Sequence, residues 1–277
     1  MSPDALGLIA GQGRLPYLVA DGARAAGCRV ICAALADSAE AELAGHVDVF
    51  RRCSVARPGS WIRLFRRHGV HEAIMVGRVA KVQLYTPWRI IRYLPDWRAF
   101  RIWYGRLRRR DTRNDTLLGA VADELKTGGI TVIDSTQYCR EHLAGAGLMT
   151  RTEPPRTVRE DMEFGWPIAK ELGRLDIGQA VAVREREVIA VEAIEGTAAM
   201  IERAGALCRK GKWTLIKVAK PSQDLRFDVP CIGPDTIRDM ARYQGACVVL
   251  EQGKVLILDK PETLALADSL GIAVLGR

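Results

Sequence analysis

The chain has 277 residues, enough for two domains of ordinary size, and its 48% hydrophobic and 27% charged residues exclude a disordered chain. The net charge of +8 at pH 7 favours a polyanionic partner, which can be a nucleic acid, an anionic membrane surface or a phosphorylated substrate.

The first half of the chain alternates short apolar runs with helix-favouring stretches. Strands are predicted over residues 5–10, 28–35, 47–55, 72–79 and 129–135, and helical structure over residues 16–26, 58–68 and 83–127. This alternation is typical of a mostly parallel sheet with helices on its faces. The sequence therefore predicts an α/β fold that begins with a Rossmann-like domain over residues 1–144.

A glycine turn follows the first predicted strand in IAGQGRLP, residues 9–16. Backbone amides at the start of the next helix attract a phosphate, and glycine allows it to approach closely. Gly11, Gln12, Gly13 and Arg14 are therefore predicted to bind substrate, and Asp37 lies where a ribose-binding acid is expected. The third glycine of the dinucleotide fingerprint is missing, so a plain tight turn stays equally open.

Gly77 and Arg78 occupy the carboxyl end of the strand predicted over residues 72–79. Open α/β sheets bind ligands at this edge. Gly77 could allow close approach of a ligand and Arg78 could pair with an anion, although a glycine that simply ends a strand is the alternative.

A basic, aromatic segment covers residues 88–113 and contains nine arginines and two aspartates. This composition suits an anionic membrane surface or RNA, and a solvated arginine face is the alternative. Asn114 and Asp115 then open a predicted helix, where Asp115 either caps the helix or contributes to a metal site.

Residues 145–157 are predicted to be a linker because they contain two glycines and a Pro-Pro pair. A second, mixed α/β domain is expected over residues 158–277. Its predicted elements are a helix over 157–172, two strands around a turn at 184–187, a helix over 195–205, a strand over 213–220, a helix over 233–245, a hairpin over 246–260, a helix over 261–271 and a final run over 272–276. Thr197 is the expected N-cap of the second helix, and Gly205 its stop.

The loop KPSQDLRFDVP, residues 220–230, gathers acids and bases between two prolines. Asp224 and Asp228 offer hard oxygen ligands, while Lys217, Lys220 and Arg226 offer cations. Magnesium needs only one or two carboxylates when water and substrate phosphates complete its shell. A salt-bridged surface loop is the alternative interpretation.

Seven cysteines without a CxxC pair argue against a disulfide framework or a zinc site and favour a reducing compartment. The first residues, MSPDALGLIA, lack the basic region and long apolar core of a signal peptide.

Four stretches together, IAGQGRLP, AVEAIEGTAAMIERAG, KVAKPSQDLRFDVPCIGPDTI and GKVLILDK, resemble the LpxI-type UDP-2,3-diacylglucosamine diphosphatase family of lipid A synthesis. The resemblance implies a cytoplasmic hydrolase, peripheral at the inner membrane, that uses Mg²⁺ or Mn²⁺. It implies cleavage of UDP-2,3-diacylglucosamine to UMP and 2,3-diacylglucosamine 1-phosphate. It also implies two α/β domains with the ligand in a cleft between them, and a homodimer.

Carried onto this chain, the resemblance makes Asp224 the essential metal-linked carboxylate and Asp228 the second, with Asp115 as a further metal ligand. It places Gly11 and Gly13 against the nucleotide or phosphate. The residues expected to bind substrate from the second domain are Glu195, Gly196, Thr197, Lys217, Lys220, Gln223 and Arg226.

Two departures from the family pattern keep another function open. Ala198 stands where the family reads aspartate in EGTDAM, and Asn114 precedes Asp115 where the family often has paired acids. A non-catalytic or altered-substrate homologue that binds a UDP-sugar lipid or another phosphorylated lipid is the alternative. RNA binding ranks last and no nucleic acid is expected, because no RNA-binding module is recognisable.

Overall fold

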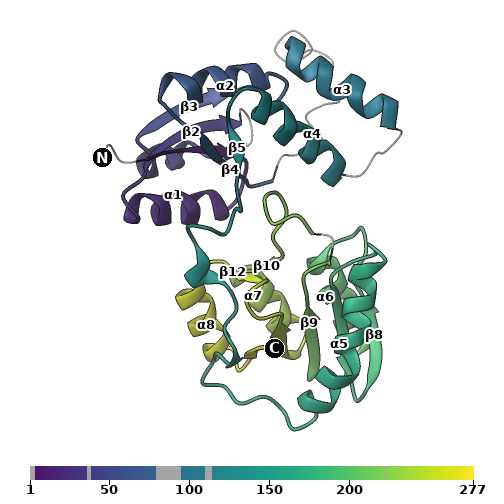
Figure 1. Cartoon of the computed structure of the whole chain (residues 1–277). Helices are drawn as coiled ribbons and strands as arrows, with labels where there is room; N and C mark the ends of the chain where they lie inside the picture. The colour runs from purple at the N-terminus through teal and green to yellow at the C-terminus, as the bar shows by residue number, and fades with distance from the viewer. Residues whose placement is uncertain (1–3, 36–38, 79–94, 110–113, 222) are drawn as a thin grey trace. The chain divides into compact units, whose positions relative to one another are not determined.

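The computed structural model describes residues 4–35, 39–78, 95–109, 114–221 and 223–277, and side chains at 103, 105–109 and 114–116 lie outside the description. Contacts divide the chain into two compact units, which are drawn in Figure 1. Unit 1 comprises Met1–Cys139 and Asp224–Asp228, and unit 2 comprises Arg140–Gln223 and Val229–Arg277. The segment Asp224–Asp228, expected in the second domain, thus makes its contacts in unit 1.

Unit 1 is built on a five-stranded sheet with the order β3-β2-β1-β4-β5, in which every pair of neighbours is parallel. This confirms the predicted Rossmann-like parallel sheet. The strands of the sheet are β1 (Ala5–Ala10), β2 (Arg29–Leu35), β3 (Val49–Cys53), β4 (Glu72–Val76) and β5 (Thr131–Val132). Among the described residues, the helices of the unit are α1 (Leu15–Ala25), α2 (Pro58–Arg67), α3 (Trp97–Arg109), α4 (Asn114–Thr127) and the short 3-10 helix η1 (Ala41–His46).

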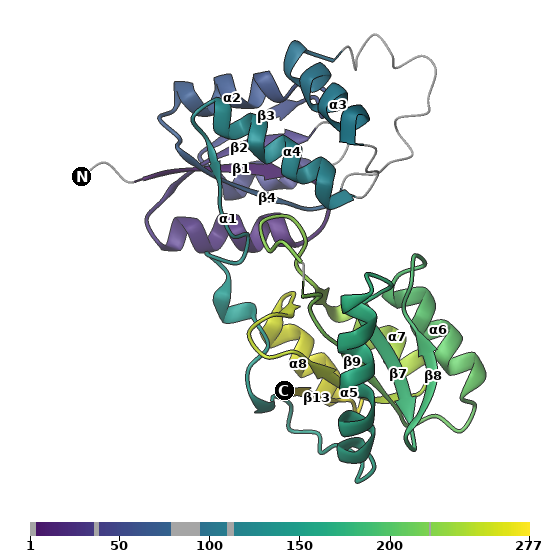
Figure 2. The same ribbon diagram turned by 45° about the vertical axis from the view of Figure 1, so that its right-hand side comes forward.

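Helices cover both faces of this sheet, which is why its central strands read as continuous apolar runs. Figure 2 shows α1 on one face and α2 and α4 on the other. Trp61 and Phe65 of α2 and Leu125 of α4 join the buried side chains of β1 and β2 in one core. Burial of each such side chain contributes about 1.5–3 kcal/mol, so this face fixes the sheet on which the candidate site stands.

The strand order reverses at β1, which lies between β2 and β4. Loops that leave two such neighbouring strands diverge, and ligands of open α/β sheets bind at the carboxyl ends of the strands at this point. The carboxyl end of β1 leads into Gly11 and that of β4 into Gly77. The fold thus places both predicted glycine segments at one edge.

Unit 2 holds a six-stranded mixed sheet with the order β6-β13-β11-β9-β7-β8, which confirms the predicted mixed α/β unit. Its strands are β6 (Gly147–Leu148), β7 (Ala180–Arg184), β8 (Glu187–Val191), β9 (Trp213–Lys217), β11 (Gly245–Leu250) and β13 (Ala273–Gly276). Helix α5 (Val158–Arg174) packs on one apolar cluster of this sheet. Helices α6 (Thr197–Leu207), α7 (Pro234–Arg242) and α8 (Lys260–Ser269) pack on the other. A 3-10 helix, η4 (Arg140–His142), opens the unit.

The predicted hairpin over residues 246–260 is wrong. Its first arm, β11, lies between β9 and β13, while its second arm, β12 (Leu256–Ile257), pairs in parallel with β10 (Cys231–Ile232). Periodicity identifies both arms as strands but carries no information about their partners.

The predicted stop of α6 at Gly205 is also wrong, because the helix runs on to Leu207. A Cβ at Gly205 would lie 2.6 Å from Cβ of Tyr243, so this glycine allows close packing of α6 rather than ending it. Among the helices that the structure describes, none is both long and apolar enough to cross a bilayer.

Candidate active site

The backbones of Gly11 and Gly77 pack directly against each other at the carboxyl edge of the sheet in unit 1. A Cβ built on Gly11 would come within 2.6 Å of the carbonyl oxygen of Arg78, and one on Gly77 within 2.7 Å of the carbonyl carbon of Gly11. The backbones of Gln12 and Arg78 also exchange two hydrogen bonds, of 2.8 and 2.9 Å. Two segments that the sequence singled out separately are therefore one structure, and it tolerates no side chain at either glycine.

The start of α1 stands next to this paired turn. Pro16 lies in the first turn of α1, and that turn contains no acidic side chain, so the positive end of the helix dipole is not neutralised locally. Arg14 and Arg78 are both exposed here. Gly13 has a φ of 102° with no atom within 4 Å of a built Cβ, so there is open space beside its backbone. This arrangement is suited to binding an anion.

The segment Asp224–Asp228 is anchored to the same edge. Ser135 donates two hydrogen bonds to the carbonyl oxygen of Leu225, from its backbone N–H at 3.1 Å and its hydroxyl at 2.6 Å. Phe227 packs against the core of unit 1. Ser135 follows β5, whose ladder continues through the hydrogen bond from Ile133 N–H to the carbonyl of Ala73 on β4. Because all strands of this sheet are parallel, the carboxyl ends of β1, β4 and β5 share one edge.

Asp224 and Arg226 form a two-point ion pair within this segment. Nη2 of Arg226 lies 2.6 Å from Oδ2 of Asp224, and Nε lies 2.9 Å from Oδ1. The hydrogen bonds from Arg226 hold the pKa of the Asp224 carboxyl below its usual value of 3.8. Asp224 in turn raises the pKa of Arg226, to which Asp123 of α4 contributes. Asp224 is therefore a carboxylate throughout the neutral range, and Asp228 is exposed beside it.

The described residues do not gather three or more carboxylate, imidazole or thiol groups in one place. Asp224 and Asp228 can thus offer one or two carboxylates, which suits a cation completed by water and phosphate oxygens but not a preformed all-protein centre. Asp115 lies in the first turn of α4, and its side chain is outside the described part of the chain. Asp37 also falls outside it, so its predicted ribose contact stays a prediction.

In unit 2, Thr197 links two buried charged side chains. Its hydroxyl donates to Oε1 of Glu192 at 2.6 Å and accepts from Nζ of Lys217 at 2.6 Å. Glu192 and Lys217 are 6% and 3% exposed, and Oε2 of Glu192 has no hydrogen-bond partner. The prediction that Thr197 caps α6 is wrong: the N-cap is Gly196, with a φ of 82°, because the threonine hydroxyl is taken by this network.

Other residues of unit 2 that were predicted to bind substrate form ion pairs or hydrogen bonds within the unit. Glu195 forms an ion pair with Arg203. Nζ of Lys220 lies 2.7 Å from Oδ1 of Asp176, and the backbone N–H of Lys220 donates to Oε1 of Gln223 at 3.0 Å. These contacts fix the start of the loop that carries Asp224.

Sequence reasoning missed two residues that hold these groups in place. Ser135 anchors Leu225, and Glu251 accepts the backbone N–H of Ala219 at 2.9 Å and the ammonium of Lys170 at 3.0 Å. Glu251 directly follows the buried strand β11, and a carboxylate there is the available signal, because a buried charge needs partners.

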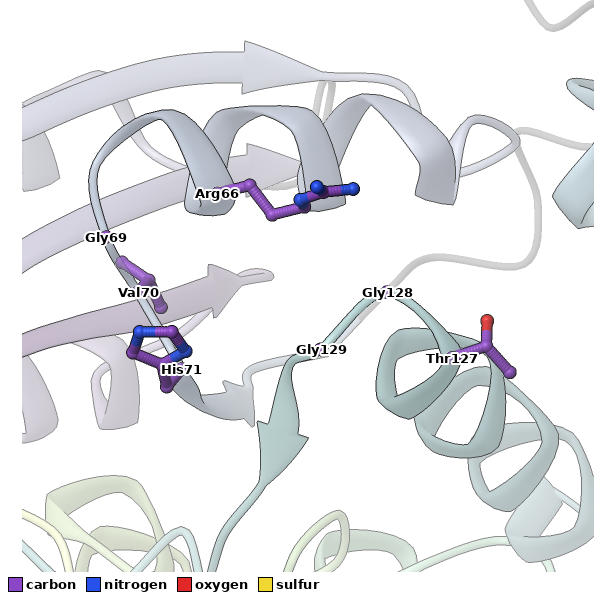
Figure 3. Close-up of a pocket in the computed structure, with 7 residues that line it drawn as sticks. All are labelled: Arg66, Gly69, Val70, His71, Thr127, Gly128 and Gly129. Atoms are coloured by element: carbon purple, nitrogen blue, oxygen red, sulfur yellow. The ribbon is translucent and has the colours of Figure 1, made fainter.

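Figure 3 shows a separate open pocket of about 400 Å³ in unit 1, lined by Arg66, Gly69, Val70, His71, Thr127, Gly128 and Gly129. It lies where α2 leads into β4 and α4 into β5, at the amino ends of those strands. None of its residues belongs to the predicted site, and the glycine turns at Gly11 and Gly77 lie at the opposite edge of the same sheet.

Two comparisons place the whole chain in a known context. The sequence model of the LpxI N-terminal domain matches residues 5–142, and that of the LpxI C-terminal domain matches residues 145–275. A protein of Caulobacter vibrioides named UDP-2,3-diacylglucosamine pyrophosphatase LpxI is 31% identical to this chain over 280 residues, which cover 98% of this chain and 96% of that protein.

Proposed function

Because the chain belongs to the LpxI family, we propose that it hydrolyses the pyrophosphate bond of UDP-2,3-diacylglucosamine. Water adds across the P–O–P linkage, and the products are UMP and 2,3-diacylglucosamine 1-phosphate. The name of the Caulobacter relative and the match over nearly the full length of both chains support the substrate and the reaction.

One observation carries the proposal beyond the likeness: the double hydrogen bond from Ser135 to Leu225. It attaches the segment that carries Asp224 and Arg226 to unit 1, at the edge where the paired glycine turn and the start of α1 lie. An acid, a guanidinium and an anion-binding turn are thus supplied by one unit. This combination suits hydrolysis of a pyrophosphate, because its barrier is lowered mainly by positioning and by stabilising charge on phosphate oxygens.

In this proposal the backbone amides at Gly11–Gly13 and the exposed guanidinium groups of Arg14 and Arg78 bind phosphate oxygens. The ionised Asp224 orients the attacking water as a hydrogen-bond acceptor. Arg226 keeps Asp224 ionised and in place. In unit 2 we propose Thr197, Lys217, Lys220, Gln223 and the turn at Glu195–Gly196 as further binding residues, as the sequence predicted.

We also propose Mg²⁺ or Mn²⁺ as the cofactor, with Asp224 and Asp228 as its protein ligands and Asp115 as a third candidate. Such an ion, when bound, neutralises charge on the phosphate oxygens and lowers the pKa of a coordinated water. The pair of Asp224 with Arg226 implies that metal binding has to compete with, or displace, the guanidinium.

A second candidate function is binding without turnover. Ala198 in the first turn of α6 leaves that turn without an acidic residue, where the family motif has aspartate. A homologue that has lost chemistry would bind the UDP-lipid and release no UMP at any metal concentration.

Product analysis separates these two functions. The purified chain is incubated with UDP-2,3-diacylglucosamine in detergent with Mg²⁺, with Mn²⁺, or with EDTA, and the products are identified by mass spectrometry. Hydrolysis predicts equimolar UMP and 2,3-diacylglucosamine 1-phosphate with either metal and neither product with EDTA. Binding of the substrate with no product in any arm would instead support the non-catalytic function, and full turnover in EDTA would refute the metal requirement.

A further inference from the structure

Three aromatic side chains form a continuous exposed stripe on α3. Trp97, Phe100 and Tyr104 are 72%, 44% and 60% exposed. Their spacing puts them on one face of the helix. The ring centroids of Trp97 and Phe100 lie 5.6 Å apart, and those of Phe100 and Tyr104 lie 6.3 Å apart, with interplanar angles of 20° and 17°. We call these three residues the aromatic stripe.

Polar contacts fix α3 within unit 1 and so keep the stripe exposed. Asp96 accepts the backbone N–H of Ala99 at 2.9 Å and that of Gly59, on α2, at 2.7 Å. On α3 itself, Arg98 donates to Oε1 of the buried Glu124 of α4 at 2.6 Å. Rotation of the helix to bury its aromatic rings would break these contacts and leave the carboxylate of Glu124 buried without its partner, which is costly.

Taken together, the sequences of α3 and of the two helices that pack against it, α2 and α4, contain more arginines than acidic residues. Helix α3 has five arginines and no acidic residue between its ends, Trp97 and Arg109. Helix α2, which packs against α3, also has no acidic residue. It exposes Arg63, Arg66 and Arg67. A contiguous exposed apolar patch of this kind on a folded protein marks an interaction site, and the charge around it indicates an anionic partner.

We propose that the aromatic stripe, with the exposed Arg101 of α3 and the exposed arginines of α2, is a docking surface for an anionic lipid bilayer. Trp and Tyr favour the boundary between acyl chains and head groups, and arginines beside them attract anionic head groups. The rings of the stripe stack on one another, which leaves less ring face open for stacking of nucleic-acid bases than an isolated aromatic platform offers. The inference rests on the proposed function for its context, because a diacylated substrate resides in a bilayer.

Vesicle flotation of the full-length chain tests the proposal without any need for turnover. The vesicles are made of phosphatidylcholine with or without phosphatidylglycerol. The variant Trp97→Ala/Phe100→Ala/Tyr104→Ala removes the stripe. A matched control, Leu148→Ala/Leu207→Ala/Leu270→Ala, removes three exposed apolar side chains of unit 2 instead. The single variant Trp97→Ser keeps the test available if the triple variant does not fold.

The proposal predicts that wild type binds the anionic vesicles, that added salt weakens this binding, and that loss of the stripe reduces the bound fraction about tenfold. Trp97→Ser is expected to bind several-fold more weakly than wild type, and the unit 2 control like wild type. Equal vesicle binding by wild type and both stripe variants would overturn the proposal. It would also be overturned if the stripe variants lost self-association or RNA binding while they still bound vesicles.

Turnover of detergent-solubilised substrate separates failure of this inference from failure of the proposed function. If wild type hydrolyses the solubilised substrate but does not bind anionic vesicles, the docking surface is refuted and the hydrolase stands. If it binds vesicles through the stripe but releases no UMP in detergent, the docking surface stands and the hydrolase is refuted.

Discussion

Ser135 holds the carbonyl oxygen of Leu225 with two hydrogen bonds, across a separation of 90 residues in sequence. This contact joins the segment Asp224–Asp228 to the parallel sheet of unit 1. The acid predicted to carry the chemistry therefore stands on the same edge as the glycine turn predicted to bind phosphate.

Replacement of Ser135 by alanine is expected to impair turnover far more than folding. The backbone N–H of Ser135 still satisfies the Leu225 carbonyl, so the free energy of unfolding falls by only about 1 kcal/mol. Asp224 is held less firmly, and kcat falls about tenfold or more because small displacements of a reacting group are costly. Ser269→Ala, which removes the hydroxyl bonded to the Leu266 carbonyl on α8, is the control. Unchanged kcat in Ser135→Ala would show that this anchor does not serve catalysis.

Gly77→Ala is expected to destabilise unit 1 by roughly 2–5 kcal/mol, because a φ of 94° disfavours a side chain and the new Cβ would meet Gly11. Gly27→Ala is the matched control: its φ is 84°, but a Cβ there meets nothing within 4 Å. It should cost only about 1–2 kcal/mol. Chemical denaturation measures the free energy of unfolding of both variants. An equal loss in the two would mean that close contact between Gly77 and Gly11 does not limit the side chain at residue 77.

Asp161 predicts a defined pH dependence. It is fully buried, Oδ1 accepts the Arg186 N–H at 2.8 Å, Oδ2 has no partner, and burial raises its pKa above 3.8. As pH rises through 3.8, the unfolded chain releases this proton before the folded chain does, so Asp161 lowers stability progressively. Asp161→Asn cannot ionise.

The free energy of unfolding of Asp161→Asn, compared with that of wild type, should therefore improve as the pH rises from about 4 to 7. Denaturation of both proteins across this range measures the trend. A difference that is constant with pH, or that moves in favour of wild type, contradicts the account.

Thr197→Val should lower the stability of the protein, although valine and threonine side chains have similar shapes. It leaves Nζ of Lys217 and Oε1 of Glu192 without the hydroxyl that joins them, and about 1–3 kcal/mol of stability is expected to be lost. Thr197→Ser restores the hydroxyl and should recover most of this stability. Similar thermal unfolding of the valine and serine variants would show that the network is not stabilising.

Much of the fold followed from local pattern. Apolar runs and glycine stops located β1, β2 and α1, because a parallel strand buried on both faces reads as an uninterrupted hydrophobic stretch. The pairing of the strands could not be predicted from local pattern. The sequences of β11 and β12 predict a hairpin, yet the two strands belong to different sheets. Side-chain hydrogen bonding also overrode local propensity at Thr197, whose hydroxyl is used by Glu192 and Lys217 rather than by the helix start.

In the candidate site, too, the sequence identified residues but not the contacts between them. Motif chemistry singled out Gly11, Gly77 and Asp224, but nothing in the chain order indicates that Gly11 presses on Gly77. Nor does it indicate that a segment near residue 225 belongs with a sheet built from the first 132 residues. Ser135, which makes that link, carries no motif of its own.

The most direct test of the account is steady-state release of UMP from UDP-2,3-diacylglucosamine by wild type and by Asp224→Asn, with Mg²⁺ present. Asp235→Asn, at an exposed aspartate paired with Arg238, is the control. The account predicts turnover by wild type and by the control, and a decrease in kcat/KM of about 10²–10⁴-fold in Asp224→Asn, with folding unchanged by circular dichroism. Turnover by Asp224→Asn at the wild-type rate would contradict it.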